Sequence, residues 1–174
     1  MDSFIEYMIA RKSTPVVKLK KFLIYLAAFV ISMLIFPFML ISVELSSMLS
    51  LLFVGVFLIA YRLTCSFNIE YEYILTNGEL DIDVITHKKR RKRILTIHSK
   101  SFIEFGKHKT TIENAATKEE FARIIDASSK SQTYDDYYAI FFKNGQKIKL
   151  IFNPTQKMID VFKLHAPRAM KLDM

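Results

Sequence analysis

The sequence predicts a membrane-inserted helical hairpin followed by a small α+β domain. Two uncharged runs, from Phe22 to Val43 and from Leu45 to Tyr61, are separated by a single acidic residue. Runs of this length match the ~20 apolar residues that cross the ~30 Å hydrocarbon core of a bilayer. From Phe67 onward, apolar and polar residues alternate, which is typical of half-buried strands. The expected domains are an N-terminal amphipathic segment at residues 1–20, a transmembrane hairpin at 21–63 and a cytoplasmic domain at 67–174.

Residues 3–12 are expected to form a short helix before the hairpin. The apolar residues at positions 4, 5, 8 and 9 fall on one helical face. Ser3 and Glu6 have the spacing of a capping box, and Thr14-Pro15 is expected to end the helix. Such a helix would lie in the headgroup region or pack on the soluble domain.

The charges around the two apolar runs predict their orientation. The turn between them, at Glu44 to Ser47, has no Lys or Arg, whereas basic residues flank the pair: Arg11, Lys12, Lys18, Lys20, Lys21 and Arg62. Basic residues concentrate on the cytoplasmic side, so both termini are expected in the cytoplasm of a multi-pass protein of the cell (inner) membrane. A buried helix pair of a soluble protein is the alternative. A cleaved signal peptide is disfavoured because the first run is too long and is followed by a second.

The spans themselves carry little functional information. Neither contains an ionisable residue, which disfavours a self-sufficient transporter. Pro37 and Gly55 are explained by packing between the helices. Cys65 is the single cysteine, so no internal disulfide is possible.

Two Asn-Gly dipeptides predict two β-hairpins in the domain after the spans. Asn77-Gly78 joins strands at 67–75 and 80–84, and Asn144-Gly145 joins strands at 137–143 and 146–152. Asn-Gly is the preferred pair for the type I′ turn of a two-residue hairpin loop. The expected registers place Leu75 opposite Leu80 and Phe141 opposite Ile148, so that each pair of apolar residues shares a face.

The remaining elements are predicted from shorter patterns. Short strands are expected at 94–97 and 101–105, and loops at 114–117 and 128–134. Residues 121–127 fit either a helix or a strand. Asn153-Pro154 is expected to cap an amphipathic helix that ends near Pro167, with the apolar stripe Met158, Ile159, Val161, Phe162 and Ala166.

This order of elements resembles a known family. A Tyr-rich strand ending in Leu75-Thr76-Asn77-Gly78-Glu79-Leu80, a basic turn, further strands and a closing helix are similar to the bacterial pleckstrin-homology-like (PH-like) domains of small membrane proteins with two preceding helices. The resemblance covers residues 67–166 and implies a bent antiparallel sheet closed by the C-terminal helix. It implies a membrane-anchored binding or scaffolding role and supplies no catalytic residue.

A basic run between the second and third expected strands is the main candidate site. It follows His87 and consists of Lys88, Lys89, Arg90, Arg91, Lys92 and Arg93. If the first strand leaves the membrane, the second returns toward it, so this run is expected to contact anionic lipid headgroups. A solvated turn that only follows the positive-inside bias is the equal alternative. Nucleic acid is a disfavoured partner because the run lacks interleaved aromatic residues.

An enzymatic role has weaker support. Asp81 and Asp83 have the spacing of a metal-binding acidic pair, but on a strand both carboxylates would lie on the solvated polar face beside Glu72. The four histidines show no metalloprotease spacing, and no phosphate-binding or nucleophile motif occurs. The sequence therefore predicts no enzyme and no cofactor. A metal-dependent membrane enzyme using Asp81 and Asp83, and a small subunit of a transport or secretion complex, remain the alternatives. A protein or peptide partner and a homo-oligomer stay open.

Overall fold

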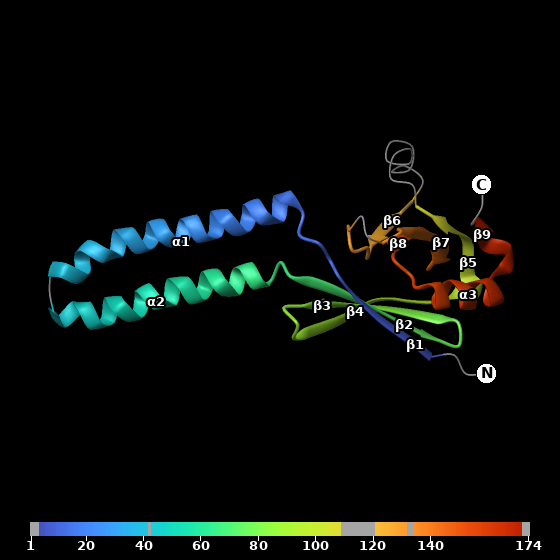
Figure 1. The fold of residues 1–174 in the computed structure, drawn as a ribbon, viewed down its shortest axis with the longest axis horizontal. Coiled ribbons are helices and arrows are strands. Elements are labelled where there is room, and N and C mark those ends of the chain that lie inside the picture. The colour runs from blue at the N-terminus through green and yellow to red at the C-terminus, as the bar shows by residue number, and fades with distance from the viewer. Residues whose placement is uncertain (1–3, 42, 109–120, 132–133, 172–174) are drawn as a thin grey trace. The chain divides into compact units, whose positions relative to one another are not determined.

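The computed structural model describes residues 4–41, 43–108, 121–131 and 134–171, and it divides into two compact units. The helical unit contains residues 13–69. The sheet domain contains residues 1–12 and 70–174, so the chain enters the sheet domain, leaves it for the helices and returns. Figure 1 shows the elements of both units. Each unit is described below by itself.

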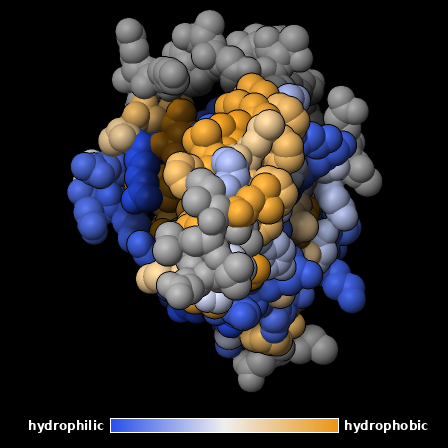
Figure 2. Space-filling model, turned by 90° about the vertical axis from the view of Figure 1, so that its left-hand side faces the viewer, coloured by the Kyte–Doolittle hydropathy of each residue, from blue (hydrophilic) through white to orange (hydrophobic). Residues whose placement is uncertain are grey.

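The helical unit consists of α1 (Pro15–Ile41) and α2 (Val43–Cys65), both long and apolar enough to cross a membrane. Only 11% of the most apolar window of each helix is buried, so among the described residues most side chains of these windows are at least partly exposed. Figure 2 shows hydrophobic side chains on this unit in orange, and its exposed residues include Phe22, Leu26, Phe29, Leu34, Leu52 and Leu58. The two apolar helices that the sequence predicts are therefore present. The expected turn at Glu44 to Ser47 is wrong, because these residues belong to α2.

The two helices pack through small and hydroxyl-bearing residues. The buried positions in the described parts of α1 and α2 are Ala28, Ser32, Ala60 and Thr64. The hydroxyl groups of Tyr25 and Thr64 lie 3.1 Å apart and form a hydrogen bond between the helices. A Cβ atom added at Gly55 would have no neighbour within 4 Å outside the adjacent backbone of its own helix. The expectation that Gly55 allows the two helices to approach is therefore wrong for this pair.

The expected N-terminal helix is wrong, because Phe4–Ala10 forms strand β1. β1 pairs antiparallel with β2 (Ile69–Thr76), from Phe4 opposite Thr76 to Ala10 opposite Glu70. Ile5 and Ile9 are four residues apart, which suits one face of a helix, but they also lie on one face of a strand together with Tyr7. Both the helical and the strand interpretation fit this spacing, and pairing with β2 decides for the strand. Because β2 follows both helices in the sequence, residues 3–12 alone do not reveal this pairing. The predicted cap at Ser3 lies outside the described residues.

The first sheet has the order β1-β2-β3-β4. β3 (Glu79–Thr86) follows the predicted Asn77-Gly78 turn, whose two residues have φ values of 50° and 85°, as a type I′ turn requires. β4 (Arg90–His98) is longer than predicted and starts within the basic run. The β3–β4 register shifts after Ile82, so that Ile94 is an extra residue in β4.

The second sheet has the order β6-β8-β7-β5-β9. Its strands are β5 (Phe102–Lys107), β6 (Arg123–Asp126), β7 (Tyr137–Lys143), β8 (Gln146–Phe152) and β9 (Met170–Lys171). The β7–β8 hairpin has the predicted bounds and register, with Phe141 opposite Ile148. The ambiguous stretch at 121–127 contains a strand, since β6 pairs parallel with β8. The expected loop at 114–117 lies outside the described residues.

The closing helix α3 (Gln156–His165) packs on a core shared by both sheets. The ring of Phe162 contacts those of Phe105 and Phe152, and Phe152 in turn contacts Tyr73 of β2. Short 3-10 helices occur at Ser99–Ser101 and Pro167–Ala169. The helix cap is Thr155 instead of the predicted residue at 153, because its hydroxyl accepts a hydrogen bond from the amide of Met158.

Asn153 serves as a buried hydrogen-bonding hub instead of a cap. Its side-chain oxygen accepts a hydrogen bond of 2.7 Å from the amide of Ser129. Its side-chain amide donates to the carbonyl of Asp135 and to the carboxylate of Asp136. One side chain thus ties the end of β8 to two loop segments that precede β7.

Candidate lipid-contact turn and tyrosine pocket

The basic run forms a tight turn followed by a strand. The amide of Lys89 donates a hydrogen bond to the carbonyl of Thr86, and the two residues between them, His87 and Lys88, have φ values of 59° and 54°. Two positive φ angles at these positions define another type I′ geometry, here without glycine. Arg90 to Arg93 belong to β4, so the charges that the sequence places in one turn are divided between the turn and a strand.

Strand alternation separates the arginines at 91 and 93 from the rest of the run. Arg91 forms an ion pair with Glu72 and lies 3.8 Å from Asp83. Arg93 donates from Nε to Asp83 at 3.0 Å and lies 3.0 Å from Asp81 through Nη1. The hydrogen bond from Arg93 to Asp83 raises the pKa of the guanidinium group. Both arginines therefore neutralise carboxylates of their own sheet.

The carboxylates that these arginines neutralise are more buried than the sequence suggests. Glu72 has no exposed surface and Asp83 is 3% exposed, so a fully solvated polar face was the wrong expectation for both. Burial raises the pKa of Glu72, and the nearby Glu6 adds to this, whereas Arg91 opposes it. A buried carboxylate is costly unless a cation compensates it, which explains why half-exposed arginines turn inward here.

The pair that was the weaker, metal-binding alternative, Asp81 and Asp83, has Arg93 between its two carboxylates. Asp81 also accepts a hydrogen bond of 2.6 Å from the hydroxyl of Thr96. The guanidinium group of Arg93 thus already compensates the negative charge of both carboxylates. Across the part of the chain that the structure describes, no group of three or more His, Cys, Asp or Glu side chains is placed to hold a metal ion.

Four cations of the run remain exposed: Lys88, Lys89, Arg90 and Lys92. Within the described ranges, none of them forms an ion pair, in contrast to Arg91 and Arg93. β3 runs antiparallel to β2, so the β3–β4 turn lies at the end of the sheet where β2 begins. This is also the end where Ala10 pairs with Glu70 and where the chain passes to and from the helical unit.

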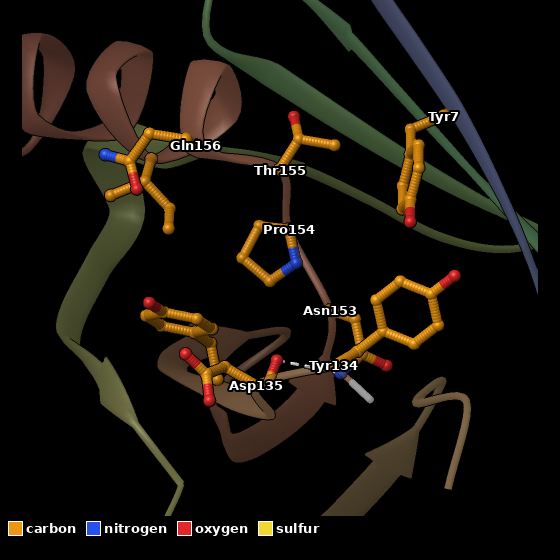
Figure 3. Close-up of a pocket in the computed structure, with 9 residues that line it drawn as sticks. Tyr7, Tyr134, Asp135, Asn153, Pro154, Thr155 and Gln156 are labelled. Carbon is orange, nitrogen blue, oxygen red and sulfur yellow. Dashed lines mark hydrogen bonds between the residues drawn. The ribbon is translucent and has the colours of Figure 1, made fainter. Parts of the chain in front are cut away.

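A second candidate site is a pocket that the sequence analysis did not predict. It is lined by Tyr7, Tyr134, Asp135, Tyr137, Asn153, Pro154, Thr155, Gln156 and Ile159, and we call it the tyrosine pocket. Figure 3 shows Pro154 in its middle, with Tyr7 and Tyr134 on one side and Asp135 on the other. Its volume is about 330 Å³.

The electrostatics of the tyrosine pocket depend on one carboxylate. Burial raises the pKa of Tyr7, and the neighbouring Tyr134 hydroxyl raises it further, so Tyr7 is neutral at physiological pH. Asp135 accepts a hydrogen bond of 3.0 Å from Lys107, whose ammonium lies 6.0 Å from the centroid of the Tyr137 ring. Tyr7 comes from β1 and the other tyrosines from the region of β7, so only the folded chain brings them together.

The fold defines the class of protein. Two sheets that share a core and are closed by one C-terminal helix are consistent with a PH-like domain, and in this chain a helical hairpin stands between the first and second strands. A family model described as "Bacterial PH-like domain (DUF6106)" matches residues 1–172, and the chain belongs to this family. The matched range includes the helical hairpin as well as β1. No curated protein and no solved structure matches the chain significantly.

Proposed function

We propose that this protein is a membrane-anchored PH-like binding module whose β3–β4 turn contacts anionic lipid headgroups. The hairpin of α1 and α2 would anchor it in the cell (inner) membrane, with both termini in the cytoplasm. The observation that carries the proposal is the division of the basic run into two arginines held by carboxylates and four exposed cations at one end of the sheet.

The energetics support a surface contact. Each Lys or Arg near an anionic leaflet contributes about 1 kcal/mol, so Lys88, Lys89, Arg90 and Lys92 together would hold the turn at the surface. The tight turn positions these charges on a strand end and not on a long loop, which lowers the conformational entropy lost on contact. The same end of the sheet connects to both helices, so the β3–β4 turn lies at the end of the sheet domain from which the chain passes to the anchor.

The test uses the full chain, because β1 precedes the helices and a fragment starting at residue 67 would lack it. A polarity-sensitive dye is attached to the cysteine introduced by Thr86→Cys in a Cys65→Ser background. The protein is placed in nanodiscs of zwitterionic lipid with or without anionic phosphatidylglycerol. Quenching of the dye by a lipid-borne quencher should increase with anionic lipid and decrease at high salt, since screening acts over about 10 Å at 0.1 M salt.

Matched variants separate this contact from net charge. Lys88→Gln with Lys89→Gln should weaken the lipid dependence of quenching, because two of the four exposed cations are lost. Lys157→Gln with Lys163→Gln changes the net charge equally on the exposed side of α3 and should leave it intact. Equal quenching in both kinds of nanodisc would show that the basic run only orients the protein in the membrane.

A further inference from the structure

The tyrosine pocket has the opposite charge character to the basic turn. Asp135 is the one charged residue in its described lining, in a chain of formal net charge +8. We propose that this pocket binds an organic cation, an ammonium or guanidinium group, with tyrosine rings as its walls and Asp135 as its counterion. This proposal concerns a different site and does not rest on the lipid contact of the β3–β4 turn.

The size of the tyrosine pocket suits one small cationic group. Its volume of about 330 Å³ is at the lower end of the range for small-molecule sites. The pocket is open to solvent on one side, and Tyr134 at its wall is 45% exposed. A ligand could therefore insert a cationic group and keep the rest of the molecule outside.

The lining has the chemistry that organic cations prefer. The faces of tyrosine rings carry negative electrostatic potential and attract ammonium and guanidinium groups. Three tyrosines line the pocket, and Asp135, across Pro154 from Tyr7 and Tyr134, supplies a full negative charge on the opposite side. The described lining contains no Lys, Arg or His, and Lys107 at its edge is paired with Asp135, so the pocket favours a cation over phosphate or carboxylate groups.

The protein itself places an ammonium group at the edge of the pocket. The Nζ atom of Lys107 is 3.0 Å from the Asp135 carboxylate and 6.0 Å from the centroid of the Tyr137 ring. The side chains of Lys107 and Asp135 are 51% and 68% exposed, and ion pairs at such positions are weak. A ligand cation can therefore replace Lys107 at the carboxylate while the lysine turns to solvent.

The test titrates choline into the full chain in a maltoside detergent, with the tyrosine rings labelled with ¹³C for NMR. The control ligand is 3,3-dimethyl-1-butanol, which has the shape of choline without its charge. Choline should shift the signals of Tyr7, Tyr134 and Tyr137 with saturation, and the neutral ligand should bind about tenfold more weakly. A parallel titration with N-acetyl-arginine amide distinguishes the two sources of the cation, because tighter binding of this probe would indicate an arginine side chain of a protein partner.

Variants decide whether the carboxylate is the counterion. Asp135→Asn should weaken choline binding about tenfold, whereas Glu79→Gln, which removes an exposed carboxylate outside the pocket, should leave binding unchanged. Tyr134→Leu should weaken binding as well, because it removes a ring from the wall. Equal binding of choline and its neutral analogue, or no saturable shift with either cation, would overturn the proposal.

Discussion

The ion pair between Arg91 and the buried Glu72 gives the sharpest test of the structure. Replacing Arg91 with methionine keeps much of the side-chain volume and removes the charge that compensates Glu72. Removing one partner of a buried ion pair typically costs about 3–5 kcal/mol. The guanidinium of Arg91 is 53% exposed and Glu72 can take up a proton, so we expect a smaller loss of unfolding free energy, about 2 kcal/mol near neutral pH.

The control is Lys88→Met, which removes one charge from an exposed residue of the same turn. Its effect should stay within about 0.5 kcal/mol, as is usual for surface substitutions without special partners. Denaturant unfolding of the full chain in detergent, followed by near-ultraviolet circular dichroism of its tyrosines, measures both variants. The sheet domain should unfold at a lower denaturant midpoint in Arg91→Met alone.

The pH dependence of this loss tests its electrostatic origin. Burial raises the pKa of Glu72 in the folded protein, so folding favours the protonated carboxyl group. The ionised group therefore lowers the free energy of unfolding, and this loss develops as the pH rises from the unfolded-state pKa through the folded-state pKa. Without Arg91 this pKa rises further. The deficit of Arg91→Met should therefore shrink when the pH is lowered from about 7.5 to about 4.5. Equal stability of the two variants, or a deficit that grows in acid, would refute this account of the basic run.

Three further predictions follow from single features. Reporter fusions at both ends of the chain should indicate the cytoplasm, and an external C-terminal signal would contradict the proposed topology. Burial opposes ionisation of Asp126, but Lys130 and Ser128 outweigh it and lower its pKa, so Asp126→Asn should destabilise the protein by about 1 kcal/mol at neutral pH. This difference should disappear in acid titrations below the folded pKa. Thr155→Ala should lower the free energy of unfolding by about 1 kcal/mol, because the helix cap is lost. Asn153→Ala should lower it by about 3 kcal/mol, because several buried groups lose their hydrogen-bond partner. Equal shifts in melting temperature for the two variants would contradict these roles.

Local sequence patterns were sufficient to predict those elements whose conformation depends only on neighbouring residues. Asn77-Gly78 and Asn144-Gly145 adopt positive φ angles readily, so both hairpins could be predicted, and the β7–β8 hairpin has the predicted register. The two apolar runs predicted two long helices for the same reason. The matched family confirms the resemblance that these elements suggested.

The candidate sites were predictable only in part. The sequence identified the basic run, but not that Arg91 and Arg93 pair with carboxylates. The other four cations, Lys88, Lys89, Arg90 and Lys92, form no ion pair within the described ranges. That division depends on where β4 begins and on which strand lies beside it. The tyrosine pocket had one sequence signal, the cluster of tyrosines around residue 134, but Tyr7, which lies on the same side of the pocket as Tyr134, is more than a hundred residues away in the sequence.

The sequence by itself determined the two apolar helices, the two Asn-Gly hairpins and the presence of a closing helix, because each depends on neighbouring residues. The tertiary structure decided that residues 4–10 form a strand, that Asp83 and Glu72 are buried, and that Asn153 is a hydrogen-bonding hub and not a cap. These outcomes depend on partners distant in sequence. A strand needs a neighbour to satisfy its backbone, and a buried polar group needs its counterpart, so neither can be assigned before the chain is folded.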